Sequence, residues 1–437
     1  MFLNKIIYIY FPFILVSTIP ITLITGPAIP DVSLVLVCII FISYLFFNKI
    51  DNLKNNFAYF TLFFWIILLI LSLISLNLYN SFGEAFIFLR MLLLPIIMYL
   101  WLLKKNSFIK ATLLIILFAN SLVLVDTFYQ FLNYHPLEGF GEDIFFRKAE
   151  LYGRLSGPFL DMVPGSYISK FFIFGFLGLT LIIKNEKILS FISIFYLTFC
   201  GFITFISGER MALATFLLAM VVSTIMLKKF RLVFLFSLVI FLIISFTTYR
   251  SHDFFQNFRI IESNPGHLGL KIEKYNPNCV GNKNCSKIIS LQPKFIYVLK
   301  NFTKSAYFET YSLSIEMIKD YPLTGIGINN FNYGCLNIDK FKRDRCWSHP
   351  HNFYLQWLTE NGLIGFVFFL IYVLFLFYKV IYSEKVSIYR NYSLIALIVI
   401  FWPIMSTGSL FKNWYGIETF FIIGLCLSIT NYKKFES

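Results

Sequence analysis

Charged residues are scarce in this chain of 437 residues: they make up 14% of it, whereas 58% is hydrophobic, and the mean hydropathy is +0.73. Soluble globular proteins carry about 25% charged and about 45–50% apolar residues. The deficit excludes an ordinary soluble domain and predicts a polytopic membrane protein. The sequence also lacks a fixed-period repeat and an appended soluble domain.

Acidic residues are fewer than basic ones, 23 against 37, which leaves a net charge of +14. In a soluble protein that excess would suggest nucleic acid as a partner. Here the basic residues lie mostly in short loops between apolar runs. In such loops, Lys and Arg determine which side of the membrane each loop faces. We therefore expect membrane lipids and no nucleic acid as partners.

The first apolar run lacks the small-residue cleavage site of a signal peptide, although a basic start precedes it. It is also long for a signal sequence and contains Pro12 and Pro20. We expect it to stay as a membrane span, one of twelve runs that approach the length of about 20 residues needed to cross a bilayer. The predicted spans are 5–24, 31–48, 57–78, 84–103, 108–132, 165–184, 187–206, 210–228, 231–248, 361–382, 390–406 and 414–431.

These spans predict an all-α integral membrane protein with nine helices in 1–248, a large loop in 249–352 and three helices in 353–437. Two loops after odd-numbered spans, 25–30 and 79–83, contain no Lys or Arg, whereas short loops after even-numbered spans, such as 49–56 and 104–107, contain several. The positive-inside rule then places both termini in the cytoplasm and the large loop on the outer side of the membrane.

The large loop holds fourteen Lys and Arg and eight acidic residues, a net charge of +6. Long loops are exempt from the positive-inside rule. The charge fits an anionic ligand, and it fits equally a solvated basic surface near lipid.

Four of the seven cysteines lie in this loop, which favours an oxidising compartment and disulfides. Close spacing suggests Cys279–Cys285 and Cys335–Cys346, although four cysteines allow three pairings. Zinc is the rival interpretation, but the chain lacks a CxxC pair in this loop.

Three arginines stand out near the predicted outer face. Arg90 lies inside a predicted span, where it binds substrate, pairs with a buried carboxylate such as Asp126, or extends its charged end outward to the interface. Arg210 begins a helix after the turn "SGE", a good place to bind phosphate bidentately, and the alternative is an interfacial anchor paired with Glu209. Arg154 lies in "GRLSGPF", a loop rich in glycine and proline, and is a candidate for binding the diphosphate or the glycan.

The strongest motif is His351-Asn352, nine residues, and then Gly362-Leu-Ile-Gly365. This H-N-x9-G-x-x-G pattern resembles the O-antigen ligase family and the related O-antigen polymerases. The preceding "DYPLTGIGINNF", the segment "RLSGPF" and Arg210 also resemble family positions.

The resemblance implies a C-type glycosyltransferase fold that works without metal or other cofactor. Its members take a glycan from an undecaprenyl-diphosphate-linked donor at the outer face of the inner membrane. A ligase passes it to a hydroxyl on lipid A–core, and a polymerase passes it to another lipid-linked glycan. By this resemblance, Arg210 binds the diphosphate and His351 activates the acceptor hydroxyl.

One family feature is missing: the second arginine shortly before the helix that ends in the D-x-P segment. Lys304 stands there instead and cannot form a bidentate fork. Arg250 and Arg259 are alternative sources of the second phosphate contact.

Around the histidine, we interpret Asn352 as an orienting group, a helix cap or a substrate contact, and the two motif glycines as a close-packing helix entry. The role of Glu360 is left open. The rival function is a transporter or a lipid-linked oligosaccharide flippase, which twelve spans would suit. The sequence lacks the internal symmetry of such transporters, and that function does not explain the basic loop.

Overall fold

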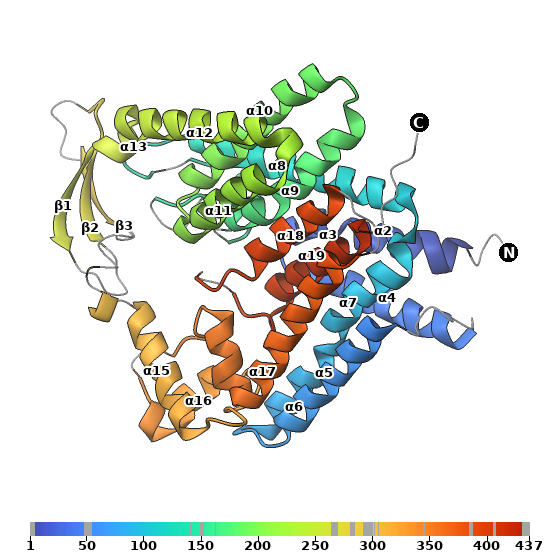
Figure 1. The fold of residues 1–437 in the computed structure, drawn as a ribbon. Coiled ribbons are helices and arrows are strands. Elements are labelled where there is room, and N and C mark those ends of the chain that lie inside the picture. Colours follow the sequence, from blue (N-terminus) through green and yellow to red (C-terminus); the bar gives the residue numbers. More distant parts are fainter. Residues whose placement is uncertain are drawn as a thin grey trace. The chain divides into compact units, whose positions relative to one another are not determined.

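The computed structural model describes residues 5–47, 55–139, 141–148, 153–161, 163–263, 270–279, 285–291, 300, 302–304, 306–343, 346–383, 388–404 and 408–430. The chain divides into two compact units. Unit 1 comprises residues 1–112 and 309–437, and unit 2 comprises residues 113–308. In Figure 1, unit 1 takes the blue and the orange-to-red ends of the colour scale, and unit 2 takes the green and yellow middle.

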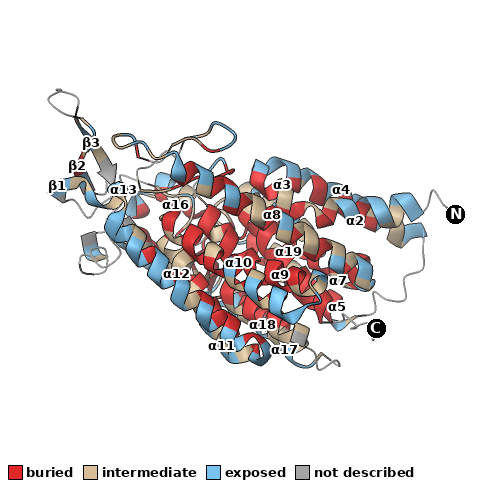
Figure 2. Ribbon diagram, turned by 90° about the horizontal axis from the view of Figure 1, so that it is seen from above, coloured by how far each residue is buried: buried red, intermediate tan, exposed pale blue. Residues whose placement is uncertain are grey.

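Unit 1 is helical in both of its segments. The first contains η1 (Ile6–Tyr10), α2 (Phe11–Ser17), α3 (Ile19–Thr22), η2 (Leu23–Thr25), α4 (Ala28–Phe47), α5 (Asn56–Ser72), α6 (Leu78–Ile87), α7 (Leu89–Leu100) and η4 (Leu102–Lys104). The second contains α15 (Ala306–Asp320), α16 (Phe331–Asn337), η7 (Asp339–Phe341), α17 (Phe353–Ile381), α18 (Ile388–Ile400) and α19 (Asn413–Ile429). Helix α19 is buried along nearly its whole length and packs against α4, α7, α17 and α18, so it forms the core of this unit (Figure 2).

Unit 2 contains most of α8 (Asn106–Leu132) and a group of packed helices. They are α9 (Pro164–Ile182), α10 (Glu186–Ile206), α11 (Arg210–Met226), η5 (Lys228–Phe230), α12 (Arg231–Ser251), α13 (Asp253–Gln256) and η6 (Phe302–Lys304). Helix α9 is buried on most sides, and α10 contacts α9, α11 and α12. Long apolar helices that also bury one another are what a polytopic membrane protein requires.

Seven described helices are long and apolar enough to cross a membrane, or up to eight if the bent segment Ile6–Thr25 counts as one span. Four shorter apolar helices, Asn56–Ser72, Arg210–Met226, Tyr389–Ile400 and Asn413–Ile429, coincide with further predicted spans. The chain is thus a mostly helical, multi-pass membrane protein. The count of twelve, the orientation of the termini and the C-type fold stay predictions.

Several predicted helix boundaries are wrong; the run predicted as 57–78, for example, ends at Ser72. The run predicted as 84–103 begins at Leu78 and breaks at Phe88, between α6 and α7. The run predicted as 361–382 begins at Phe353. Hydropathy placed this start too late because residues 356–361 are mostly polar, and tertiary packing buries them nonetheless.

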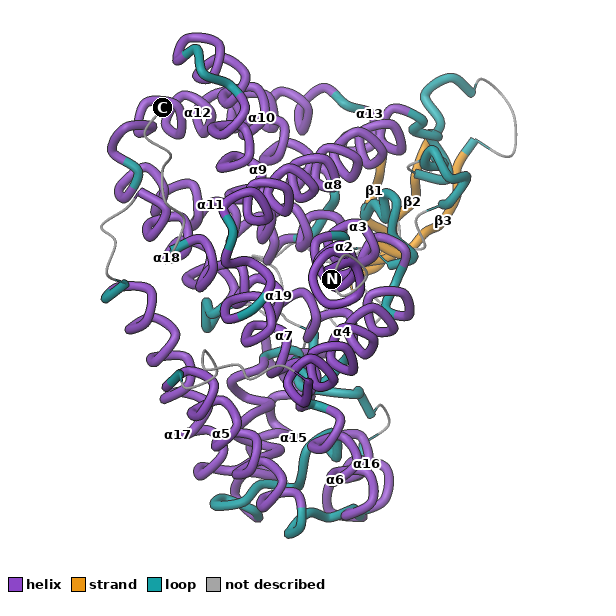
Figure 3. The backbone as a smooth tube through the Cα atoms, turned by 90° about the vertical axis from the view of Figure 1, so that its right-hand side faces the viewer, coloured by secondary structure: helices purple, strands orange, loops and turns teal. Residues whose placement is uncertain are grey.

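The sequence did not predict a sheet, and the structure has one in unit 2. Strands β1 (Phe258–Ser263), β2 (Leu270–Tyr275) and β3 (Ser286–Leu291) form an antiparallel sheet in the order β1-β2-β3, drawn in orange in Figure 3. The alternation of polar and apolar residues in "LKIEKY" is the signal that would have identified it.

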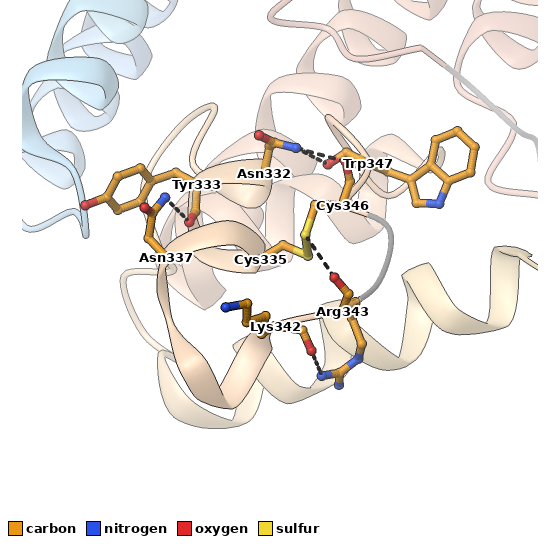
Figure 4. The surroundings of a disulfide bond; sticks show 8 residues. All are labelled: Asn332, Tyr333, Cys335, Asn337, Lys342, Arg343, Cys346 and Trp347. Atoms are coloured by element: carbon orange, nitrogen blue, oxygen red, sulfur yellow. Dashed lines mark hydrogen bonds between the residues drawn. A yellow bond between two sulfur atoms is a disulfide. The ribbon is translucent and has the colours of Figure 1, made fainter.

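Two disulfides join the four loop cysteines, in the pairs that close spacing suggests. Cys279–Cys285 closes the connection between β2 and β3. Cys335–Cys346 ties α16 to the segment that precedes the histidine motif (Figure 4). A paired cysteine has no thiolate to offer zinc, so these pairings exclude the zinc interpretation.

The predicted large loop, 249–352, is divided between the two compact units. Its first part, up to residue 308, belongs to unit 2, and the remainder belongs to unit 1. In unit 1, α15, α16 and η7 enclose a small apolar core of Leu313, Met317, Ile326, Phe331, Cys335 and Phe341. Helix α15 ends just before Pro322, and its residues Leu313 and Met317 are buried in this core.

Candidate functional site

The turn before α11 and the loop around Arg154 lie against each other in unit 2. The backbone N–H of Leu155 donates to the carbonyl oxygen of Ser207 at 3.1 Å. Gly208 has a φ of +79°, and a β-carbon there would lie 2.1 Å from the carbonyl oxygen of Gly153. Only glycine allows this approach, which brings the loop to the start of α11.

Gln130, near the end of α8, holds the same loop from another side. Its Oε1 accepts from the backbone N–H groups of Ser156 at 3.0 Å and Gly157 at 2.9 Å. Its Nε2 donates to the Ser156 hydroxyl at 3.1 Å. The sequence did not single out Gln130, because a lone polar residue at a span end carries no local signal of a contact 26 residues away.

Glu209 is buried and forms a cap on α9; no ion pair joins it to Arg210 among the described residues. Its Oε1 accepts from Gly165 N at 2.6 Å and its Oε2 from Ser166 N at 3.2 Å. Burial raises the pKa of this carboxyl to about 7, while the charge of Arg154 acts in the opposite direction. Near neutral pH the carboxyl is therefore only partly ionised, so it offsets only part of the neighbouring positive charge.

Arg154 and Arg210 keep unused hydrogen-bond donors. Arg154 lies close enough to repel the charge of Arg210, and its Nε is buried without a hydrogen-bond partner. Across the described ranges no hydrogen bond or ion pair engages the Arg210 side chain. Two adjacent guanidinium groups with free donors suit an anion with several oxygens, such as a diphosphate.

Arg90 has a structural role in unit 1. Its Nε lies 2.9 Å from Asp31 Oδ1, and another guanidinium nitrogen donates to Asn413 Oδ1 at 2.8 Å. It therefore ties α7 to α4 and α19. The suggested pairing with Asp126 is wrong, because Arg90 pairs with Asp31 and Asp126 accepts from the backbone N–H of Ile144.

Arg250, Arg259 and Lys304 are weaker candidates than Arg154 for the second phosphate contact. The Arg250 guanidinium lies over the Phe246 ring, 5.4 Å from its centroid, and Arg259 pairs with Glu273 in the sheet. The side chain of Lys304 lies outside the described residues. Arg154 is the cation whose charge acts directly on Arg210.

His351 lies in a turn ahead of α17. Its φ is +56°, in the left-handed region that few non-glycine residues adopt. Its ring lies 5.4 Å from the Trp347 ring and 4.4 Å from the His349 ring, centroid to centroid. Burial lowers the pKa of this imidazole, so the neutral, proton-accepting form prevails at neutral pH. A neutral histidine held in a strained turn fits a general base.

Asn352 caps α17, as one of its predicted roles requires. Its Oδ1 accepts from Leu355 N at 3.0 Å, and its Nδ2 donates to the carbonyl oxygen of Pro403 at 2.9 Å. These two bonds use both ends of the amide. Asn352 therefore orients the histidine turn relative to α17.

Gly362 breaks α17, and the segment 322–327 fills the break. Gly362 has a φ of +61°. Four backbone hydrogen bonds of 2.8–3.1 Å join the segment 322–327 to α17 at this break. The donors and acceptors are Ile326 N to Thr359 O, Gly327 N to Glu360 O, Leu363 N to Pro322 O, and Ile364 N to Leu323 O. The D-x-P segment and the glycine motif, which the sequence shows as separate pieces, thus form one structure.

Glu360 belongs to this junction. It is fully buried, and Gln356 Nε2 donates both to its Oε2 at 3.0 Å and to Ser409 Oγ at 2.8 Å. The backbone N–H groups of Asn329 and Phe331 point at the carboxyl group. Its partners lie in the helix junction, so its position supports a structural role.

Replacing Gly362 by alanine is expected to destabilise unit 1. The backbone angles there are tolerated essentially only by glycine, at a cost of about 1–3 kcal/mol for other residues. A β-carbon would also lie 2.3 Å from the Leu323 backbone. We expect a lower melting temperature in detergent and a loss of activity. Gly83→Ala is the matched control, because nothing lies within 4 Å of a β-carbon there; equal melting temperatures for the two variants would contradict the prediction.

Comparison with known proteins adds one match. Residues 195–370 match the model of a family described as O-antigen ligase. The matched stretch includes Arg210, His351, Gly362 and Gly365, whereas Arg154 lies before it. No curated protein matches the chain.

Proposed function

We propose that this chain, whose residues 195–370 match the O-antigen ligase family, transfers a glycan from an undecaprenyl-diphosphate-linked donor to a hydroxyl of lipid A–core. The observation that carries the proposal is that one family match contains both Arg210 and the complete histidine motif. We place the reaction at the periplasmic face of the inner membrane, the side to which charge patterning assigns both groups.

The donor half of the proposal rests on Arg154 and Arg210. When the bond between the anomeric carbon and the diphosphate oxygen breaks, the bond electrons leave with the diphosphate. Positive charge placed where this negative charge develops lowers the barrier. The two guanidinium groups have donors free for this purpose.

The acceptor half rests on His351. The acceptor hydroxyl oxygen forms the new bond to the anomeric carbon, and the imidazole takes the proton that the hydroxyl loses. A sugar hydroxyl is a weak nucleophile, and a positioned base accelerates such a step by about 10²–10⁴-fold. The products are the glycosylated acceptor, undecaprenyl diphosphate and a proton, so the step balances without a metal or redox partner.

The glycan profile of a deletion strain tests the proposal. We expect loss of all capped lipid A–core, restored by the wild-type gene, because no other step attaches the glycan to the core. Core capped by a single repeat unit would instead assign the chain as a polymerase. An unchanged profile would contradict both forms of glycan transfer.

A further inference from the structure

A polar pocket of about 460 Å³ lies in unit 1 beside the histidine turn. Side-chain amides dominate its lining, with one hydroxyl from tyrosine, one from serine and a single cation. The asparagines are Asn80, Asn329, Asn332 and Asn337. Their crowding is unusual in a chain so poor in polar residues, and the catalytic proposal leaves it unexplained.

Each of these amides uses its nitrogen for the fold and leaves its oxygen free. Asn332 Nδ2 donates to the carbonyl oxygens of Cys346 and Trp347 at 2.9 and 3.3 Å, and Asn337 Nδ2 donates to Tyr333 O at 2.9 Å (Figure 4). The amides of the other two asparagines likewise donate, to backbone oxygen, to a neighbouring amide and to a carboxylate. In the described part of the chain none of the four amide oxygens accepts a hydrogen bond, and none is a buried unsatisfied atom. The pocket therefore presents fixed, accessible acceptors.

Two donors complete the lining. Within the described residues, the Tyr333 hydroxyl and the Lys412 ammonium group make no hydrogen bond or ion pair, and the charge of Lys412 also acts on the buried Glu360 carboxyl. Amide acceptors combined with a few donors match the hydroxyl groups of a sugar, each of which both donates and accepts. One lysine supplies a point charge suited to a single anionic substituent.

The pocket wall is connected to His351 through His349. Ser348 lines the pocket, and its Oγ lies 2.9 Å from His349 Nδ1. The His349 ring in turn lies 4.4 Å from the His351 ring. The Cys335–Cys346 disulfide holds the same wall in place. Only His349 therefore separates the Ser348 wall of the pocket from the ring proposed to deprotonate the acceptor.

We propose that this pocket binds the terminal sugar of the acceptor glycan, with Lys412 facing an anionic substituent such as a phosphate or carboxylate. The proposal rests on the acceptor role of His351. The donor diphosphate is a poor fit here, because the lining offers one cation where two phosphates require more.

Kinetics of the purified full-length protein test this assignment, with lipid A–core from the producing organism as the acceptor. Leu336→Trp fills the pocket, and Lys412→Met and Tyr333→Phe each remove a donor that makes no hydrogen bond or ion pair within the described residues. We expect the acceptor KM to rise by about tenfold for the first two and by about threefold for the last, with the donor KM unchanged. Ile315→Trp, at another exposed aliphatic residue, and Lys342→Met are the matched controls. Unchanged acceptor KM values, or a rise in the donor KM instead, would overturn the assignment.

Direct binding separates this proposal from the catalytic one. Delipidated core oligosaccharide is added to the His351→Ala protein, and saturation-transfer NMR detects binding. We expect binding to persist in that variant and to disappear when Leu336→Trp is added. If the wild type transfers no glycan but this pattern holds, the pocket assignment stands and the ligase assignment does not. Binding that survives Leu336→Trp would exclude the pocket.

Discussion

His351→Ala is expected to lower the rate of glycan transfer by about 10²–10⁴-fold, the contribution of a positioned general base. The protein should stay folded and inserted, because the imidazole lies in a turn ahead of α17 and not within its packed core. Alanine is also tolerated less well than glycine at the φ of +56°. His351→Gly therefore serves as a second variant, one that relieves the backbone strain and should be equally inactive.

His349→Ala is the comparison that separates the two histidines of the motif. It should keep most of the activity, because Asn352 still orients the turn. If His349→Ala were as inactive as His351→Ala, and both proteins were folded, the general base would be wrongly assigned.

The pH profile gives an independent measure of His351. Burial lowers its pKa below the usual 6.5, so the folded protein favours the neutral form. The value of kcat/KM should be constant near neutral pH and fall as the pH falls through a pKa below 6.5, where the base becomes protonated. An acid limb centred above 6.5 would contradict the assignment.

Arg210→Ala is expected to reduce kcat/KM for the lipid-linked donor by about 10²–10³-fold, as the loss of a group that stabilises developing charge does. Arg154→Ala should cost about 10–100-fold, because it removes charge-assisted hydrogen bonds to the same anion. The double variant should lose less than the product of the two effects, since both side chains serve one ligand. Initial rates with purified protein and varied donor measure all three.

Arg210→Lys keeps the charge but loses the planar fork, so its activity should lie between those of wild type and Arg210→Ala. Arg250→Ala tests the rival second cation. Because Arg250 is seated over Phe246, its removal should change donor kinetics little. A larger loss from Arg250→Ala than from Arg154→Ala would exclude Arg154 as the second phosphate contact.

Local sequence signals predicted much of the helical fold. Runs of apolar residues identify membrane helices because each residue contributes to hydropathy independently of its partners. The spacing of His351 and the glycines led to the family in the same way, as a pattern read along one stretch of chain. The sheet was missed because its strands are short and each carries only a few alternating residues.

What the sequence determined by itself is the membrane class, the order of its apolar helices and the motif that carries the proposed base. Only the tertiary structure decided that Arg90 pairs with Asp31, that Arg154 stands beside Arg210, and that buried Glu360 belongs to a helix junction. The reason is physical: hydropathy and spacing are local properties, whereas these partners are brought together by packing. The asparagine pocket shows the same limit, since its polar side chains come from separate parts of the sequence and only folding brings them together.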